Sequence, residues 1–424
     1  MQFLIWAVAL FSAVSIVEAA PATTANTSLN HAEAIARMLE NNPQLQVAEF
    51  DNRAAAARIR QQTLTTPWHV GMELEDFAGT GIREGVDTLQ TTISLGRVFE
   101  LGNKPELRGE VAQAQAALVN SEQDAKRLDL MAETTRRFLD LAHAQEKMIL
   151  AKESVTIKHR TLAVVRQRSK LGKAANVDFN RAKIDLARAE LGMEAAEHLI
   201  TNARQSLARM WGDLDMDIQQ VSADLYRLES VPDIASLDVL IEKNPSLVKF
   251  ATQQRLAEAR IRLASAANQP NLEVSGGIRH YNLLDDLGLV FSLKVPLGSQ
   301  SRARAARDEA VALSEREPLL IKDKKLALRS TLIGLHQELT HDRHVVDTML
   351  KRIIPAARSM LKDYNSGYAA GRYSLLELTQ AEDVLLKARL EALNAAADYQ
   401  RNRAEIDRLT GAALSHLPDL GVNP

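Results

Sequence analysis

Residues 69–77 read His-Val-Gly-Met-Glu-Leu-Glu-Asp-Phe, and residues 89–96 read Leu-Gln-Thr-Thr-Ile-Ser-Leu-Gly. Apolar and polar side chains alternate in both segments, which is the period of a strand with one apolar and one polar face. The same alternation returns at residues 272–279 and 287–295. The sequence therefore predicts four strands of about ten residues each, arranged as two pairs.

Two interpretations fit these strands. A strand that is half buried on a soluble core alternates in this way, so the pairs could be ordinary surface hairpins. The pattern also matches an outer-membrane β-barrel, whose strands are apolar toward lipid and polar toward the lumen. Four strands cannot enclose an aqueous pore, and an open sheet edge in lipid leaves backbone groups without hydrogen bonds. A barrel therefore requires several chains, and three copies would supply twelve strands.

A very long helix is expected after the first strand pair. Leu107, Val111, Ala114 and Leu118 begin a seam with alternating steps of four and three residues, which continues to Ala142. As one helix, residues 104–171 would reach about 100 Å. In the second half, Pro318 and Pro355 interrupt the corresponding run and predict bends. The heptads alone would favour a coiled coil, but a coiled coil does not account for the strands.

The chain is internally duplicated. Residues 42–45 (Asn-Pro-Gln-Leu) return as residues 244–247 (Asn-Pro-Ser-Leu), about 200 positions later. Residues 209–212 correspond in the same way to residues 408–411. Each half therefore reads as a helix, two strands, a very long helix, a glycine-marked turn and another helix. The expected organisation is a signal peptide (1–20), a first repeat (21–212), a linker (213–235), a second repeat (236–411) and a C-terminal tail (412–424).

The signal peptide is read from an apolar run between Phe3 and Val17, followed by small residues around Ala20. The run is too short to span a membrane, and no later segment offers about 18 consecutive apolar residues. We therefore expect an exported chain that could enter a membrane only as strands.

Composition excludes several classes of function. Only 4% of residues are aromatic, which argues against a large, compact enzyme core. Lysine and arginine total 52 against 54 acidic residues, so the chain has no field that would gather nucleic acid. The absence of cysteine removes disulfides, thiolate catalysis and lipid attachment at an N-terminal cysteine. No catalytic or phosphate-binding motif is present, so we expect neither an enzyme nor a cofactor.

The chain resembles the TolC-type outer-membrane efflux proteins, and among them the CzcC-like components of heavy-metal cation efflux systems. The motifs that carry this resemblance are Asn-Pro-x-Leu at 42–45, Glu-Leu-Glu-Asp-Phe-Ala-Gly-Thr-Gly at 73–81, Phe-Glu-Leu-Gly-Asn-Lys at 99–104, Gly-Tyr-x-x-Gly-Arg-Tyr-Ser-Leu-Leu-Glu-Leu at 367–378 and Arg-Leu-Thr-Gly at 408–411. The resemblance implies a mainly α-helical homotrimer, with a twelve-stranded β-barrel in the outer membrane of a Gram-negative bacterium and a helical barrel in the periplasm. It implies two partners, a periplasmic membrane-fusion adaptor and an inner-membrane pump of the resistance-nodulation-division (RND) type. The chain itself would be the passive exit.

The resemblance also suggests site residues. Three groups are expected: the periplasmic gate (Tyr368, Glu377, Gln380 and Asp178), the turns that contact the adaptor (Gly172, Lys173, Gly371 and Arg372) and, from the polar strand faces, the barrel lumen (Glu73, Glu75, Gln90, Glu273, Arg279 and Lys294). Gln380 stands where many relatives carry a second acidic residue, and Tyr373 where some carry an arginine. An acidic residue such as Asp178 is equally a preference of the first helical turn.

Other readings remain open at this stage. His341 and His344 share one helix face at a spacing that suits a metal, although solvated surface histidines are common. A duct for drugs or other organic compounds would have the same fold. A periplasmic adaptor or scaffold also combines long hairpins with β-structure. Such a protein should show one hairpin and a membrane anchor, whereas this sequence shows two hairpins and no anchor.

Overall fold

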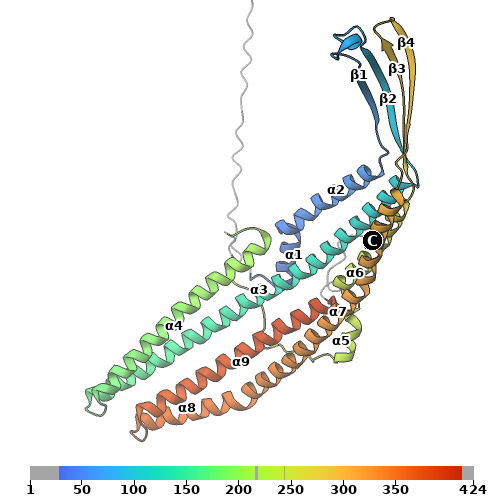
Figure 1. Ribbon diagram of the computed structural model, residues 1–424. Coiled ribbons are helices and arrows are strands. Elements are labelled where there is room, and N and C mark those ends of the chain that lie inside the picture. Colours follow the sequence, from blue (N-terminus) through green and yellow to red (C-terminus); the bar gives the residue numbers. More distant parts are fainter. Residues whose placement is uncertain (1–27, 215–217, 243, 413–424) are drawn as a thin grey trace, which may run out of the picture.

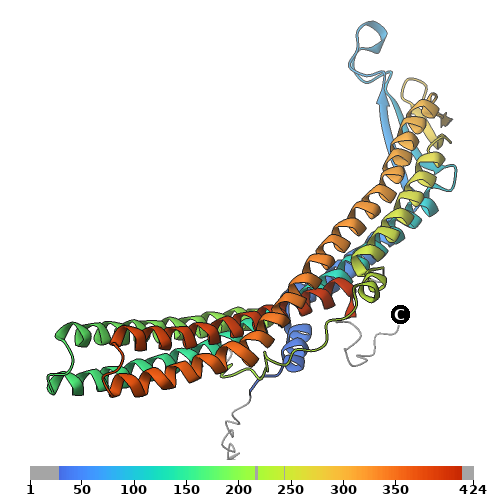
Figure 2. The same cartoon turned by 90° about the horizontal axis from the view of Figure 1, so that it is seen from below.

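The computed structural model describes residues 28–214, 218–242 and 244–412. The predicted signal peptide and nearly all of the C-terminal tail lie outside these residues. The molecule is elongated, with the strands at one end and the turns of two helical hairpins at the other (Figure 1). Figure 2 shows that the helical part is bent near its middle.

The two halves contain the same order of elements. The first half comprises α1 (His31–Asn41), α2 (Pro43–Thr63), β1 (Trp68–Glu75), β2 (Gln90–Glu100), α3 (Lys104–Lys170) and α4 (Asn176–Ala208). The second half comprises α5 (Ile234–Ile241), α6 (Pro245–Ala266), β3 (Asn271–Tyr281), β4 (Asp286–Lys294), α7 (Ser299–Thr348), α8 (Ile354–Ala369) and α9 (Leu375–Thr410). The sequence predicted one helix before each strand pair, whereas the structure has two.

The repeated Asn-Pro motif explains the extra helix. Asn42 ends α1, and its side chain accepts a hydrogen bond from the Gln44 backbone to begin α2 (2.8 Å). The buried Asn42 amide also donates to the carbonyl of Met210 (2.6 Å). Asn244 does the same in the second half, where it donates to the carbonyl of Leu409 (2.7 Å). Each asparagine thus caps one helix and fastens the end of the last helix of its own half.

The long helices largely follow the sequence. α3 is one uninterrupted helix of 67 residues, and Pro105 lies in its first turn, where a missing N–H costs no hydrogen bond. α7 continues through Pro318 without a break. The interruption comes just before Pro355, where residues Met349–Ile353 form one π-helical turn between α7 and α8.

The strands form one antiparallel sheet in the order β1-β2-β3-β4. The register aligns Met72, Ile93, Ile278 and Leu289 across the four strands, so the predicted apolar residues share one face. No core covers this face in the chain, and Leu289 is 91% exposed. The interpretation as surface hairpins on a soluble core therefore does not hold, because such hairpins would bury these residues.

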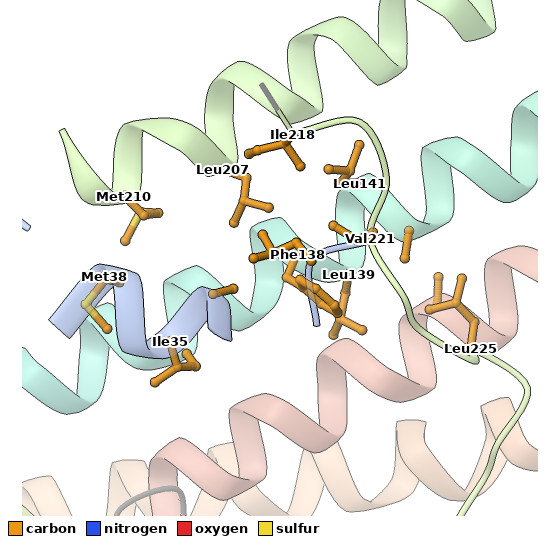
Figure 3. Packing of buried hydrophobic residues seen from close by; sticks show 14 of the residues in the cluster. Ile35, Met38, Phe138, Leu139, Leu141, Leu207, Met210, Ile218, Val221 and Leu225 are labelled. Carbon is orange, nitrogen blue, oxygen red and sulfur yellow. The ribbon is translucent and has the colours of Figure 1, made fainter. Parts of the chain in front are cut away.

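The main hydrophobic core packs α1, α3 and the end of α4 together (Figure 3). Ile35 and Met38 of α1 pack there with Phe138 of α3 and Leu207 at the end of α4. The segment between the two halves adds Val221, whose backbone bridges to Leu29. This core fixes the connecting segment against the helices, and the strands and hairpin turns extend away from it.

Among the described residues, no helix is both long enough and apolar enough to cross a membrane.

Candidate functional site

The turns of the two hairpins lie close together at one end of the molecule (Figure 1). Gly172 joins α3 to α4 with φ +68°, and Gly371 joins α8 to α9 with φ +79°. This left-handed conformation lets a helix end in a tight reversal at little cost for glycine. Lys173 and Arg372 follow the glycines and are exposed. All four predicted turn residues therefore occupy equivalent positions in the two repeats.

Arg168, near the end of α3, connects the two turns. Its guanidinium donates to the backbone carbonyls of Tyr368 and Ala369 at the end of α8, the second at 3.2 Å. It also donates to the carbonyl of Lys173 in its own hairpin (3.3 Å). Arg168 was not predicted from the sequence, because its partners are backbone atoms that carry no signal there.

Tyr368, a predicted gate residue, lies buried beneath this arginine. The Arg168 guanidinium is 4.7 Å from the centre of the Tyr368 ring, which is a cation–π contact. Among the described residues, the Tyr368 hydroxyl has no hydrogen-bond partner. Burial raises the pKa of Tyr368; the Arg168 charge lowers it and the nearby Asp178 carboxylate raises it. The structure thus places Tyr368 and Asp178 near one another across the two hairpins.

Glu377, a second predicted gate residue, begins α9. Its carboxylate accepts hydrogen bonds from the Ser374 backbone N–H and hydroxyl, both at 2.8 Å, and the Ser374 hydroxyl accepts one from the Glu377 N–H. These hydrogen bonds from Ser374 hold the pKa of Glu377 below its usual value. Glu377 is therefore ionised at neutral pH. Ser374 and Glu377 together form a capping box, so Glu377 also has a local role in starting α9. Gln380 lies one turn further along and is exposed.

Tyr373 closes the second turn. Its ring lies 4.7 Å from the ring of Tyr364, centre to centre, and covers Gly367 so closely that any side chain there would collide with it. The position at which some relatives carry arginine is therefore used here for aromatic packing, and the charge at this end comes from other residues.

The six predicted lumen residues share the polar face of the sheet. Arg279 pairs with Glu75 (2.6 Å) and donates to Thr92 (2.8 Å) and Gln90 (3.0 Å). Lys294 lies 3.6 Å from Glu273, and Glu73 is exposed on the same face. Positive and negative charges are therefore interleaved, and most of them are paired within the chain.

The histidine pair suggested as a weak metal candidate is exposed on α7. His341 and His344 belong to no metal-binding group, since the described residues contain no set of three or more His, Cys, Asp or Glu side chains that could hold a metal ion. The donor set is too small for a structural zinc site, which takes four ligands.

Comparison with known proteins identifies the family. The profile of the family described as "Outer membrane efflux protein" matches residues 34–213 and 237–412, one segment in each half. The chain belongs to this family.

Individual outer membrane efflux proteins are distant in sequence but similar along most of the chain. The "Cobalt-zinc-cadmium resistance protein CzcC" of Cupriavidus metallidurans is 24% identical over 76% of this chain and 78% of its own length. "Outer membrane protein TolC" of Escherichia coli is 21% identical over 91% of this chain and 83% of its own length. The solved structure of the outer-membrane channel OprN has a TM-score of 0.74 at 16% identity and covers 90% of this chain and 89% of its own.

Membership of the outer membrane efflux proteins accounts for the main features. The chain is an outer-membrane efflux channel and not an enzyme. The uncovered apolar face of the sheet marks its membrane part, and the helices extend into the periplasm. The paired hairpin turns are then the periplasmic end.

Proposed function

We propose that three copies of this chain form the exit duct of a tripartite efflux system, which passes heavy-metal cations to the exterior. An RND pump in the inner membrane and a periplasmic adaptor would deliver the cations. The observation that carries this proposal is that each side of the protomer ends in uncovered edges. On each side, one strand of the sheet and one helix of the helical wall have no neighbour beyond them in the chain.

The sheet and the row of helices below it have their edges in the same order across the protomer. The sheet ends at β1 on one side and at β4 on the other. Below it, α2 packs on α3, α3 on α6 and α6 on α7, so α2 and α7 are the end helices of the row. α2 buries none of its residues within the chain, and its Phe50 is 62% exposed. In a head-to-tail ring, β4 and α7 of one copy would meet β1 and α2 of the next copy, and both walls would close together.

Three copies give this ring a suitable size. A closed barrel of twelve strands has room for an aqueous lumen, whereas eight strands leave an interior that side chains fill. The polar sheet face would line this lumen, including Glu73, Glu75 and Arg279.

The proposed gate is the pair of hairpin turns. Tyr368, Asp178, Glu377 and Gln380 lie at or just behind these turns, and three copies would arrange each of them as a ring. A ring of ionised Glu377 side chains would favour cations in a narrow passage. Arg168 would hold the two turns together at rest. The exposed turns themselves would be the contact for the adaptor.

A metal cargo is supported by the similarity to CzcC, whose name states cobalt, zinc and cadmium resistance. The chain is also similar to TolC, whose name states no metal or other cargo. An organic cargo is therefore the second candidate. The test is growth of a deletion strain, with and without the restored gene, on salts of cobalt, zinc, cadmium, nickel, copper and silver and on dyes, detergents and antibiotics. Sensitivity confined to particular cations supports the proposal. Sensitivity to organic compounds alone would contradict the metal cargo and leave the duct.

A further inference from the structure

The apolar face of the sheet carries one charged residue. Across the four described strands, Arg97 of β2 is the single lysine, arginine, aspartate or glutamate on this face. It lies in register with Trp68 of β1 and Val274 of β3. Two residues further along β2, Phe99 belongs to the last row of the face before the helices begin. Arg97 therefore lies at the helical end of the sheet, about 20 Å along β2 from Thr91 at the other end.

This position places Arg97 where the membrane part of the chain meets the periplasm. An arginine is costly at the middle of a bilayer but costs little near the interface, where its long side chain can extend the charge toward the headgroups. The exposed apolar rows of the face lie on one side of Arg97, and the helices lie on the other (Figure 1). We therefore expect the guanidinium at the depth of the phospholipid phosphates of the periplasmic leaflet.

Neutral groups alone hold the Arg97 guanidinium. Its Nε donates to the carbonyl of Thr66 (3.1 Å) and its Nη2 to the hydroxyl of Thr65 (2.7 Å). Both threonines belong to the segment that joins α2 to β1. Within the described part of the chain, no carboxylate pairs with Arg97, and its Nη1 has no acceptor. The two threonines thus fix the direction of a planar donor group whose charge is left for an anion outside the chain.

Two aromatic rings frame the guanidinium. Its central carbon is 5.5 Å from the centre of the Trp68 ring and 5.7 Å from that of Phe99, so both are cation–π contacts. Trp68 is 58% exposed and Phe99 45% exposed. Aromatic rings are typical of membrane interfaces, where they contact both apolar chains and headgroups. An arginine between two exposed rings therefore suits a phosphate that is attached to apolar chains better than a free phosphate.

The charges at the two ends of the sheet differ. The segments that join the strands to the helices contain no charged residue (64–67, 101–103, 267–270 and 295–298). α7 then begins with three exposed arginines before its first acidic residue, namely Arg302, Arg304 and Arg307. The connections at the far end, 76–89 and 282–285, contain Arg83 against Asp76, Glu84, Asp87 and Asp285. The helical end is therefore the one that favours an anionic lipid.

We propose that Arg97, Trp68 and Phe99 form a binding site for an anionic phospholipid of the periplasmic leaflet, which we call the leaflet site. Arg97 binds the lipid phosphate through the N–H groups that the threonines leave free. The two rings contact the glycerol and the first carbons of the acyl chains. The inference depends on the membrane face of the sheet and not on the proposed cargo or gate.

Trp68 itself reports whether a lipid occupies the leaflet site. The chain has three tryptophans, of which Trp6 lies in the predicted signal peptide and Trp211 is 4% exposed in the main core. In the processed protein, Trp68 is therefore the tryptophan that acyl chains can reach. Bromine atoms on an acyl chain quench tryptophan fluorescence on contact. The full processed chain is placed in bilayers of equal parts phosphatidylglycerol and phosphatidylcholine, with bromine on one of the two lipids at a time.

Brominated phosphatidylglycerol should quench the wild type at least about two-fold more than brominated phosphatidylcholine, because the anionic lipid is concentrated at the site. Arg97→Gln should remove this difference but keep the quenching by phosphatidylcholine, since the rings remain. Arg97→Lys should keep a reduced difference, because an ammonium group lacks the planar fork. Arg83→Gln is the matched control, since it removes a positive charge at the far end of the sheet, and it should behave as the wild type.

Three results would overturn the leaflet site. The first is equal quenching by the two lipids in the wild type, a comparison that needs no variant to fold. The second is a full lipid preference in Arg97→Gln. The third is an equal loss of preference in Arg97→Gln and Arg83→Gln, because the preference would then follow net charge alone.

Inorganic phosphate separates a lipid from a free anion. Added at the concentration of the lipid phosphate, it should leave the preference for phosphatidylglycerol unchanged. If it abolishes the preference, the site takes free phosphate, and the assignment to a lipid is wrong.

Discussion

Arg168 and Tyr368 join the two repeats at the hairpin turns: the guanidinium lies against the tyrosine ring and donates to the carbonyl of the same residue. The last carbonyls of a helix have no partner within that helix. Arg168 therefore caps α8 from a different hairpin. A side chain that supplies both a ring contact and carbonyl hydrogen bonds couples the positions of the two turns.

Loss of Arg168 should loosen the turns. In Arg168→Ala we expect a higher resting conductance in planar bilayers and greater sensitivity of cells to bulky antibiotics. Arg168→Lys should be intermediate, since an ammonium group lacks the planar fork that reaches several carbonyls. Arg166→Ala is the matched control, because Arg166 contacts Phe179 of its own hairpin. Equal effects of Arg166→Ala and Arg168→Ala would contradict a specific role for Arg168.

Glu377 should reveal separate contributions from its charge and from its cap. Glu377→Gln can keep the capping box but removes the negative charge, whereas Glu377→Ala loses both. We expect the glutamine variant to lose cation selectivity, measured as the reversal potential in a salt gradient, with little change in melting temperature. The alanine variant should lose selectivity and also melt at a lower temperature, because it loses the capping box. If the glutamine variant keeps full selectivity, Glu377 is a helix cap only.

Arg279 should control the charge of the proposed lumen. Its removal leaves Glu75 without its countercharge, so each copy adds one net negative charge to the polar face. Arg279→Ala should therefore shift the reversal potential toward stronger cation selectivity. Arg83→Ala breaks the pair with Asp76 in the β1–β2 connection and serves as the control. A shift of equal size in both variants would argue against a lumen position for Arg279.

His143 gives the middle of the molecule a pH dependence. Burial lowers the pKa of His143, the neighbouring Arg401 and Lys147 act in the same direction, and the hydrogen bond with Asn394 (2.9 Å) opposes the change. The folded chain thus binds this proton less readily than the unfolded chain. The stability from neutral His143 is complete above about pH 6.5 and is lost as pH falls through the lowered folded pKa.

Melting temperatures measured at about pH 7 and about pH 5 test this dependence. The wild type should lose more stability on acidification than His143→Gln, which keeps a side chain that can hydrogen-bond Asn394 and cannot be protonated. Equal losses would show that His143 does not contribute to the acid sensitivity.

The sequence predicted the features that depend on local pattern. Alternation located all four strands, the heptad seam located α3, and Gly172 and Gly371 marked the turns. Patterns could not show contacts between distant segments. Arg168 has backbone partners about 200 residues away. Lys158, which donates to Glu382 and Asp383 of α9, reads in the sequence as one charged residue among many on a long helix. The two interior prolines had different outcomes: the helix is interrupted just before Pro355, as predicted, whereas α7 continues through Pro318 without a break.

The mass of the particle extracted from the outer-membrane fraction tests the proposed ring of three chains. The two sets of unpaired edges predict that the chain needs detergent for extraction and that the protein part of the particle has about three times the mass of one processed chain. A soluble monomer in the periplasmic fraction would contradict this assembly, because the outer edges of β1, β4, α2 and α7 would then remain uncovered.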